Sequence, residues 1–149
     1  MDKKSNFKIS KQESSGFLLW QVTTLWQREI KSALENINLS HSGFVILASL
    51  IWFKEQNQEV TQTTIIEHSK LDKMTVSKSL KTLEKNYLIL RTENEKDTRA
   101  KTITLTDKGL NLAVKSIEIV EDIDIHFFAK LNIEEKENLN KIFNTLKES

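Results

Sequence analysis

The stretch 71–106 constrains the fold more than any other part of the chain. It begins with an amphipathic helix, for which Asp72 is a good N-cap residue and Thr75 occupies the N3 position. A predicted strand at 88–93, a charged turn and a clearly alternating strand at 100–106 follow directly, which favours a β-hairpin. The apolar stripe of the helix has spacings of four, three and four, and consists of Val76, Leu80, Leu83 and Tyr87.

The rest of the chain is predicted to be helical. Proline is absent and glycine occurs only at positions 16, 43 and 109, so long helices are unobstructed. Apolar spacings of three and four predict the other helices, for which the candidate N-caps are Ser40, Asn132, and either Thr106 or Asp107. The expected ranges are 17–37, 41–55, 62–69, 107–131 and a last helix from 132. That last helix should direct Leu139, Ile142, Phe143 and Leu146 inward. The segment NQEVTQ, residues 57–62, is compatible with a turn and a very short strand around Val60.

This order of elements is that of a winged helix-turn-helix. Helices 62–69 and 72–86 supply the helix-turn-helix, and the hairpin supplies the wing. In such a motif the second helix enters the major groove of DNA. Met74, Lys78, Lys81 and Lys85 project to the face opposite the apolar stripe, flanked by Thr75, Ser77 and Thr82. Lysines and hydroxyls suit base edges and phosphates, and methionine suits thymine methyls; the alternative is an ordinary solvated helix face.

The tip of the hairpin carries a second candidate contact. Arg99 is placed to enter a narrow minor groove, where the potential is most negative. Asp97, two residues earlier, is expected to hold that guanidinium through a bidentate pair, and Lys96 and Lys101 would lie near phosphates. The alternative is a surface hairpin whose exposed Asp–Arg pair contributes little.

Charge is segregated along the chain although the net charge is only +1. Residues 70–101 contain nine Lys/Arg and five Asp/Glu, a net of +4, whereas residues 117–149 contain four lysines and eight acids, a net of −4. We expect only the middle of the chain to meet a polyanion. The start of the chain has lysines without an apolar stretch behind them, unlike a signal peptide, and the apolar run 43–53 is too short to span a bilayer. No membrane association is therefore expected.

The terminal helices offer more apolar surface than a small central domain covers. In 107–131, apolar residues lie on several sides of the helix, which indicates that more than one surface encloses it. A homodimer built from both ends of the chain accounts for this excess. The expected fold is mainly α with a small β-hairpin wing, divided into dimerisation helices at 1–39 and 107–149 and a winged helix-turn-helix DNA-binding domain at 40–106.

Residues 71–112, LDKMTVSKSLKTLEKNYLILRTENEKDTRAKTITLTDKGLNL, resemble the core of the MarR family of bacterial transcriptional regulators. That family places an Asp-x-Arg-Ala wing tip before a strand that ends in Leu-Thr-x-x-Gly, as Leu105, Thr106 and Gly109 do here. The resemblance implies a homodimer on a pseudo-palindromic operator, with recognition helices one DNA turn apart. It also implies that Met74, Thr75, Ser77, Lys78 and Lys81 face the major groove, Arg99 the minor groove, and Thr61, Gln62 and Thr63 the phosphates.

The sequence departs from the family pattern at three points. Tyr87 stands where a glycine usually follows the recognition helix, so we expect Asn86 to take the left-handed position instead. Thr98 stands where a second arginine is frequent, which weakens the expected grip of the wing. The chain has no cysteine, which excludes the peroxide-sensing branch of the family, disulfides and thiol chemistry.

The remaining chemistry-bearing residues give weaker signals. His41, His68 and His126 share no metal-ligand spacing, and the paired carboxylates lie on acidic helix faces, so no metal, no cofactor and no catalytic set is expected. Trp20, Trp26 and Trp52 are candidates for core or interface. The resemblance also implies a cleft between dimerisation helices and DNA-binding domain that takes small aromatic molecules, and these tryptophans are the candidates to line it.

Together these observations predict a sequence-specific, cytoplasmic, homodimeric DNA-binding regulator, and a repressor is favoured over an activator. A small aromatic effector would release it by favouring a dimer whose recognition helices no longer match the operator. The rival is a winged-helix protein-interaction module without DNA binding. An enzyme is disfavoured because no acid–base or nucleophile set converges.

Overall fold

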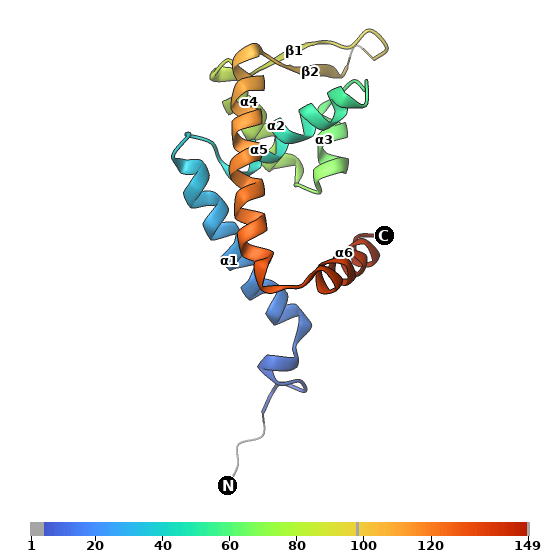
Figure 1. The fold of residues 1–149 in the computed structure, drawn as a ribbon. Helices are drawn as coiled ribbons and strands as arrows, with labels where there is room; N and C mark the ends of the chain where they lie inside the picture. The colour runs from blue at the N-terminus through green and yellow to red at the C-terminus, as the bar shows by residue number, and fades with distance from the viewer. Residues whose placement is uncertain (1–4, 98, 149) are drawn as a thin grey trace.

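The computed structural model describes residues 5–97 and 99–148. Its elements confirm the mainly α fold with one hairpin, and Figure 1 shows the hairpin at one end of the long helix α5 and α6 extending sideways from the other end of that helix. In chain order they are the 3-10 turn η1 (Lys11–Glu13), α1 (Ser15–Glu35), α2 (His41–Glu55), α3 (Gln62–Ser69), α4 (Lys73–Lys85), β1 (Ile89–Glu93), β2 (Lys101–Leu105), α5 (Asp107–Phe127), the 3-10 turn η2 (Phe128–Lys130) and α6 (Ile133–Lys147).

Side-chain caps define where the predicted helices start. Ser40, Asp72, Thr106 and Asn132 each accept a hydrogen bond from the backbone N–H three residues on, as N-caps do. Thr106 therefore caps α5, and Asp107 is its first residue. The expected helix 107–131 is shorter than predicted, because α5 ends at Phe127 and one 3-10 turn follows.

The core lies where α2 meets α1, α3, α4 and α5. Its fully buried side chains come from all of these helices and from β1, and include Leu34, Ile46, Leu47, Ile65, Leu80 and Ile89. The strands pair antiparallel with Arg91 opposite Ile103. Ile103 is buried and Leu105 packs against the core, as their alternation predicts. The hairpin is thereby fixed to the helices by its inward face.

The connection before α3 forms no strand, contrary to the expectation around Val60. Val60 is buried, and its carbonyl accepts one hydrogen bond from the Ile103 amide at 2.8 Å. A single bond is too little for a strand, yet it attaches β2 to the loop that leads into α3.

The turn after α4 corrects two predictions. Tyr87, not Asn86, takes the left-handed conformation, with φ 59°, whereas Asn86 has φ −88°. The amides of Tyr87 and Leu88 donate to the carbonyls of Glu84 and Leu83, which is a Schellman motif. The left-handed turn carries the Tyr87 side chain out to 75% exposure, so it is not part of the apolar stripe.

Gly109 is required by close packing. A Cβ at this position would overlap the carbonyl of Leu88, because the first turn of α5 lies directly against the start of the hairpin. Thr106 secures the same junction: its amide donates to Leu88 O at 3.1 Å and its hydroxyl to Tyr87 O at 2.7 Å. The Leu-Thr-x-x-Gly segment thus joins the wing to the long helix α5.

The terminal helices leave a large apolar surface uncovered. The sequence predicted that the apolar side chains of α6 point into a core. In this single chain none of the residues of α6 is buried, so that prediction is wrong for the single chain. Ile142, Phe143 and Leu146 are 54%, 44% and 71% exposed. Helix α1 adds further exposed apolar side chains, namely Phe17, Leu18, Leu19, Trp20, Val22 and Leu25.

Candidate nucleic-acid interface

Helices α3 and α4 are held together by contacts that sequence patterns do not reveal. Thr61 caps α3 in a reciprocal capping box with Thr64, and Lys70 ends the helix in the left-handed conformation. Gln62 donates from Nε2 to Ser77 Oγ at 2.6 Å, across the two helices. Gln62 and Ser77, predicted to meet phosphate and base respectively, are therefore partners of each other, while Thr63 is exposed.

The outward face of α4 is laid out as the sequence predicts. Val76, Leu80 and Leu83 are buried against α2, which leaves Met74, 84% exposed, and the exposed Lys78 and Lys81 on the outer side. No apolar group from the described residues covers this cationic face, so it is accessible to a polyanion.

The N-terminus of α4 is organised by Asp72. Its carboxylate accepts from the Thr75 amide at 2.7 Å and from the Thr75 hydroxyl at 2.8 Å. The Thr75 backbone and side-chain hydrogen bonds lower the pKa of Asp72 below its usual value, because they favour the charged form. The hydroxyl hydrogen of Thr75 is thus committed within the helix cap, and the two lone pairs of its oxygen remain able to accept from a ligand.

The base of the wing is tied to the recognition helix by an ion pair. Arg91 donates from Nε to Glu84 Oε2 at 3.2 Å and from Nη2 to Glu84 Oε1 at 3.0 Å. Hydrogen bonding to Arg91, more than its charge, lowers the pKa of Glu84. This two-bond ion pair connects the last turn of α4 to the middle of β1. The two candidate DNA-contacting elements are therefore linked to each other by side chains.

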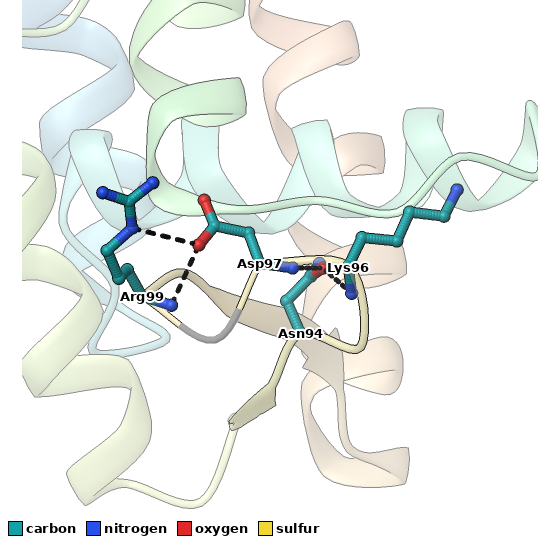
Figure 2. A network of polar contacts seen from close by, with 4 residues as sticks. All are labelled: Asn94, Lys96, Asp97 and Arg99. Carbon is teal, nitrogen blue, oxygen red and sulfur yellow. Dashed lines mark hydrogen bonds and ion pairs between the residues drawn. The ribbon is translucent and has the colours of Figure 1, made fainter.

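At the wing tip, Asp97 and Arg99 interact, but not as a fork. Asp97 Oδ1 accepts both from the Arg99 backbone amide at 3.0 Å and from Arg99 Nε at 3.4 Å (Figure 2). The expected bidentate guanidinium pair is therefore wrong in its geometry, since one carboxylate oxygen takes both bonds. The Arg99 side chain is 92% exposed, so its outer nitrogens are directed to solvent; Thr98 lies outside the described residues. Lys96 and Lys101 are exposed as well.

Asn94 is a site residue that the sequence reasoning missed. Its Oδ1 accepts from the amides of Lys96 at 2.9 Å and Asp97 at 3.1 Å, as Figure 2 shows. An asparagine that bonds the amides two and three residues on is a frequent turn former, and that preference is the signal that could have identified it. Asn94 is also buried, at 8% exposure, although it belongs to a charged tip.

The three tryptophans lie in separate surroundings. Trp26 donates from Nε1 to Asp124 Oδ1 at 2.8 Å and meets His41 edge-on, 5.3 Å between ring centroids, where α1, α2 and α5 meet. Trp52 stacks on His68 at 5.1 Å. Trp20 is 69% exposed and lines an open groove of about 230 Å³ on α1. Each tryptophan thus has different neighbours among the described residues.

The Trp26 surroundings include a titratable group. Burial lowers the pKa of His41 below its usual value, and the charge of Asp124 partly opposes this. Within residues 5–97 and 99–148, no three His, Cys, Asp or Glu side chains gather as metal ligands would. No helix in that part of the chain is long and apolar enough to cross a membrane.

Comparisons with known proteins identify this architecture. A family model for the ArnR1-like winged-helix domain matches residues 35–124. The HTH-type transcriptional regulator YdcH of Bacillus subtilis, itself uncharacterised, is 40% identical over 116 residues, which cover 78% of this chain and 79% of YdcH. This relative is a transcriptional regulator and not an enzyme.

Solved structures show the same fold. Bordetella bronchiseptica BpsR, whose DNA binding is regulated by 6-hydroxynicotinic acid, gives a TM-score of 0.85 at 19% identity over 96% of this chain and 99% of its own. A putative MarR family regulator from Listeria monocytogenes, in complex with a 26mer DNA, gives a TM-score of 0.80 at 22% identity over 91% of this chain and 88% of its own. The chain therefore belongs to the ArnR1-like winged-helix family and to the HTH-type transcriptional regulators, and its fold is that of MarR family regulators.

Proposed function

We propose that this regulator is a cytoplasmic homodimeric repressor that binds a pseudo-palindromic operator. In this proposal α4 lies in the major groove with Met74, Thr75, Ser77, Lys78 and Lys81 toward the bases. The wing lies at the adjacent minor groove with Arg99, and Lys96 and Lys101 meet phosphates together with Thr61, Gln62 and Thr63. One observation carries the proposal. The helix α4 and the wing are joined by the Glu84–Arg91 ion pair, and both expose positively charged side chains.

The two parts of the chain have separate roles in this proposal. Residues 40–106 form the DNA-binding domain, and 1–39 with 107–149 form the dimerisation region. The uncovered apolar side chains of α1 and α6 support that division, because exposed apolar surface of this extent indicates an interface. A dimer would also supply two symmetry-related DNA-binding domains, one for each half of an inverted repeat.

The DNA-binding part is tested by selection from a random-sequence duplex pool with the purified protein. We expect an inverted repeat with half-sites about 10–10.5 base pairs apart. Binding of a labelled selected duplex, measured by fluorescence anisotropy at several salt concentrations, should weaken linearly in log–log form as counterions are released. The alternative function, a winged-helix module that binds only protein, is established instead if no duplex is enriched and none binds at low salt.

The repressor assignment needs its own measurement. The selected repeat, placed between a promoter and a reporter gene, should give lower reporter output when the protein is expressed than when it is absent. Higher output would identify an activator and would leave the DNA-binding part of the proposal intact.

The proposal includes release from DNA by a small aromatic effector. Two observations support it: the regulation of BpsR by 6-hydroxynicotinic acid, and the position of Trp26 with Asp124 and His41 where α1, α2 and α5 meet. A ligand there would touch both the dimerisation helices and the first helix of the DNA-binding domain. Anisotropy of the protein–DNA complex, titrated with 6-hydroxynicotinic acid as the first probe, should fall for the wild type and fall less for Trp26→Phe. An unchanged signal with a panel of aromatic acids would remove the effector from the proposal. The groove at Trp20 and the stack at Trp52 are the other candidate places, to be tested by the same substitution.

A further inference from the structure

Asn94 connects three separate segments of the chain. Its Nδ2 donates to Thr102 Oγ1 on β2 at 2.9 Å and to Glu59 Oε2 at 3.4 Å, in the loop before α3. Its Oδ1 accepts from the backbone amides of Lys96 and Asp97 in the wing tip. Every polar atom of this buried amide therefore has a partner, so its orientation is determined.

Asn94 is connected to Arg99 through Asp97. Asn94 holds the amide of Asp97, and the carboxylate of Asp97 in turn holds the backbone amide and Nε of Arg99. The turn is closed by two backbone bonds, from Asn94 N to Ala100 O and from Ala100 N to Asp97 O, both 3.1 Å. Asp97 is the one ion-pair partner that Arg99 has among the described residues.

The other side of Asn94 faces the helix-turn-helix. Glu59 lies two residues before Thr61, the N-cap of α3, and the neighbouring Val60 carbonyl accepts from the Ile103 amide. The Asn94 side chain thus links the wing tip to the loop that precedes α3. This link is additional to the backbone connection through β1 and β2. An exposed arginine gains most from such preorganisation, because an unrestrained side chain loses rotamer entropy on binding.

We propose that Asn94 is a positioning residue for DNA recognition, which fixes the wing tip so that Arg99 is presented to the minor groove. The inference rests on the proposed DNA binding of this chain. It assigns Asn94 no contact with DNA: the residue acts through Asp97 and Arg99.

A double-mutant cycle tests this coupling with the duplex selected by the wild-type protein. Arg99→Ala and Asn94→Ala should each weaken binding, the first by about 5-fold or more and the second by a similar or smaller factor. In the Arg99→Ala background, Asn94→Ala should change affinity by less than about 2-fold, since independent effects would simply add. An equal loss in both backgrounds, as general destabilisation would produce, overturns the proposal. Thr104→Ala, at an exposed position on β2, is the matched control and should bind as the wild type does.

A charge-neutral exchange supplies a rescue. Asn94→Asp keeps an acceptor for the two tip amides but places a second carboxylate beside Glu59, so it should weaken binding. In the double variant Asn94→Asp/Glu59→Gln, residue 59 supplies the amide donor and residue 94 the carboxylate acceptor. The net charge of the pair is the same as in the wild type, and the Thr102 hydroxyl can rotate to donate to residue 94. The double variant should recover most of the wild-type affinity. Failure to recover more than the Asn94→Asp variant alone overturns the assignment of Glu59 and Asn94 as a positioning pair.

The outcomes separate the two proposals. If the wild-type protein selects no duplex, the proposed function fails before any variant is measured. If the wild type and Arg99→Ala differ but Asn94→Ala binds as the wild type does, DNA binding stands and only the role of Asn94 is refuted.

Discussion

Arg91 donates from two guanidinium nitrogens to the two carboxylate oxygens of Glu84, and this pair spans the left-handed turn between α4 and β1. The pair lies where the chain passes from α4 into the hairpin. It therefore links the two elements proposed to contact DNA by a side-chain contact in addition to the backbone. Its dependence on pH gives a first test of the structure.

Glu84 should make stability depend on pH. Its pKa is lowered in the folded state, so its contribution is fully present above the pKa of the unfolded chain and is lost as pH falls through the folded pKa. In urea denaturation, the wild type should be more stable than Glu84→Gln near neutral pH, and the difference should shrink in acid. Glu118→Gln, at an exposed position on α5, controls for the loss of one negative charge. A difference that does not vary with pH would contradict the ion pair.

Arg99→Ala should reduce DNA affinity without reducing stability. The side chain is 92% exposed, and its ion pair among the described residues is with Asp97 in the same loop, so its loss should leave the core untouched. We expect a loss of about 1–3 kcal/mol in binding free energy and a smaller salt dependence. Anisotropy titrations of the selected duplex measure both, and an unchanged affinity would show that the wing tip does not contact DNA.

Tyr87→Gly should stabilise the fold. Tyr87 has φ 59°, a conformation that is energetically unfavourable for L-residues with a Cβ. Its ring is mostly exposed, so burial of the side chain does little to offset this strain. Removing that strain should raise the free energy of unfolding by about 1 kcal/mol, reduced by the greater freedom of glycine in the unfolded chain. Asn57→Gly, also at positive φ, is the control with a smaller expected gain, because asparagine tolerates this region. A destabilised Tyr87→Gly variant would contradict the strain argument.

Gly109→Ala should destabilise the junction between the wing and α5. The added methyl group meets the backbone carbonyl of Leu88, which cannot move aside as a flexible side chain could. We expect a loss of about 1–3 kcal/mol, the usual cost of overpacking, despite the better helix propensity of alanine. Thermal unfolding measures the change. Gly16→Ala, where a Cβ would meet nothing within 4 Å, should be neutral or stabilising.

A chain that ends at residue 131 should be monomeric. It lacks α6, whose apolar side chains are exposed in the single chain and which we propose to be covered in a dimer. Sedimentation velocity of the full chain and of the truncated chain gives the comparison, with circular dichroism to verify that α1–α5 remain folded. A soluble, folded and dimeric truncated chain would place the interface on other helices.

The sequence by itself determined the main helices, the two strands of the hairpin, their order and the side of α4 that faces outward. Those features depend on local rules: cap residues at Ser40, Asp72 and Asn132, an apolar stripe at helical spacing, and alternation in β2. Local rules also located the wing tip, because the Asp97–Arg99 contact joins residues two apart.

Only the tertiary structure decided how these parts are joined. The bonds from Gln62 to Ser77, from Glu59 to Asn94 and from Trp26 to Asp124 link residues 15, 35 and 98 positions apart, and no local pattern specifies such pairs. Tyr87 shows the same limit within one turn. Propensity favoured Asn86 for the left-handed position, but burying Leu88 against the core requires the chain to reverse at residue 87, and packing outweighs a strain of about 1 kcal/mol.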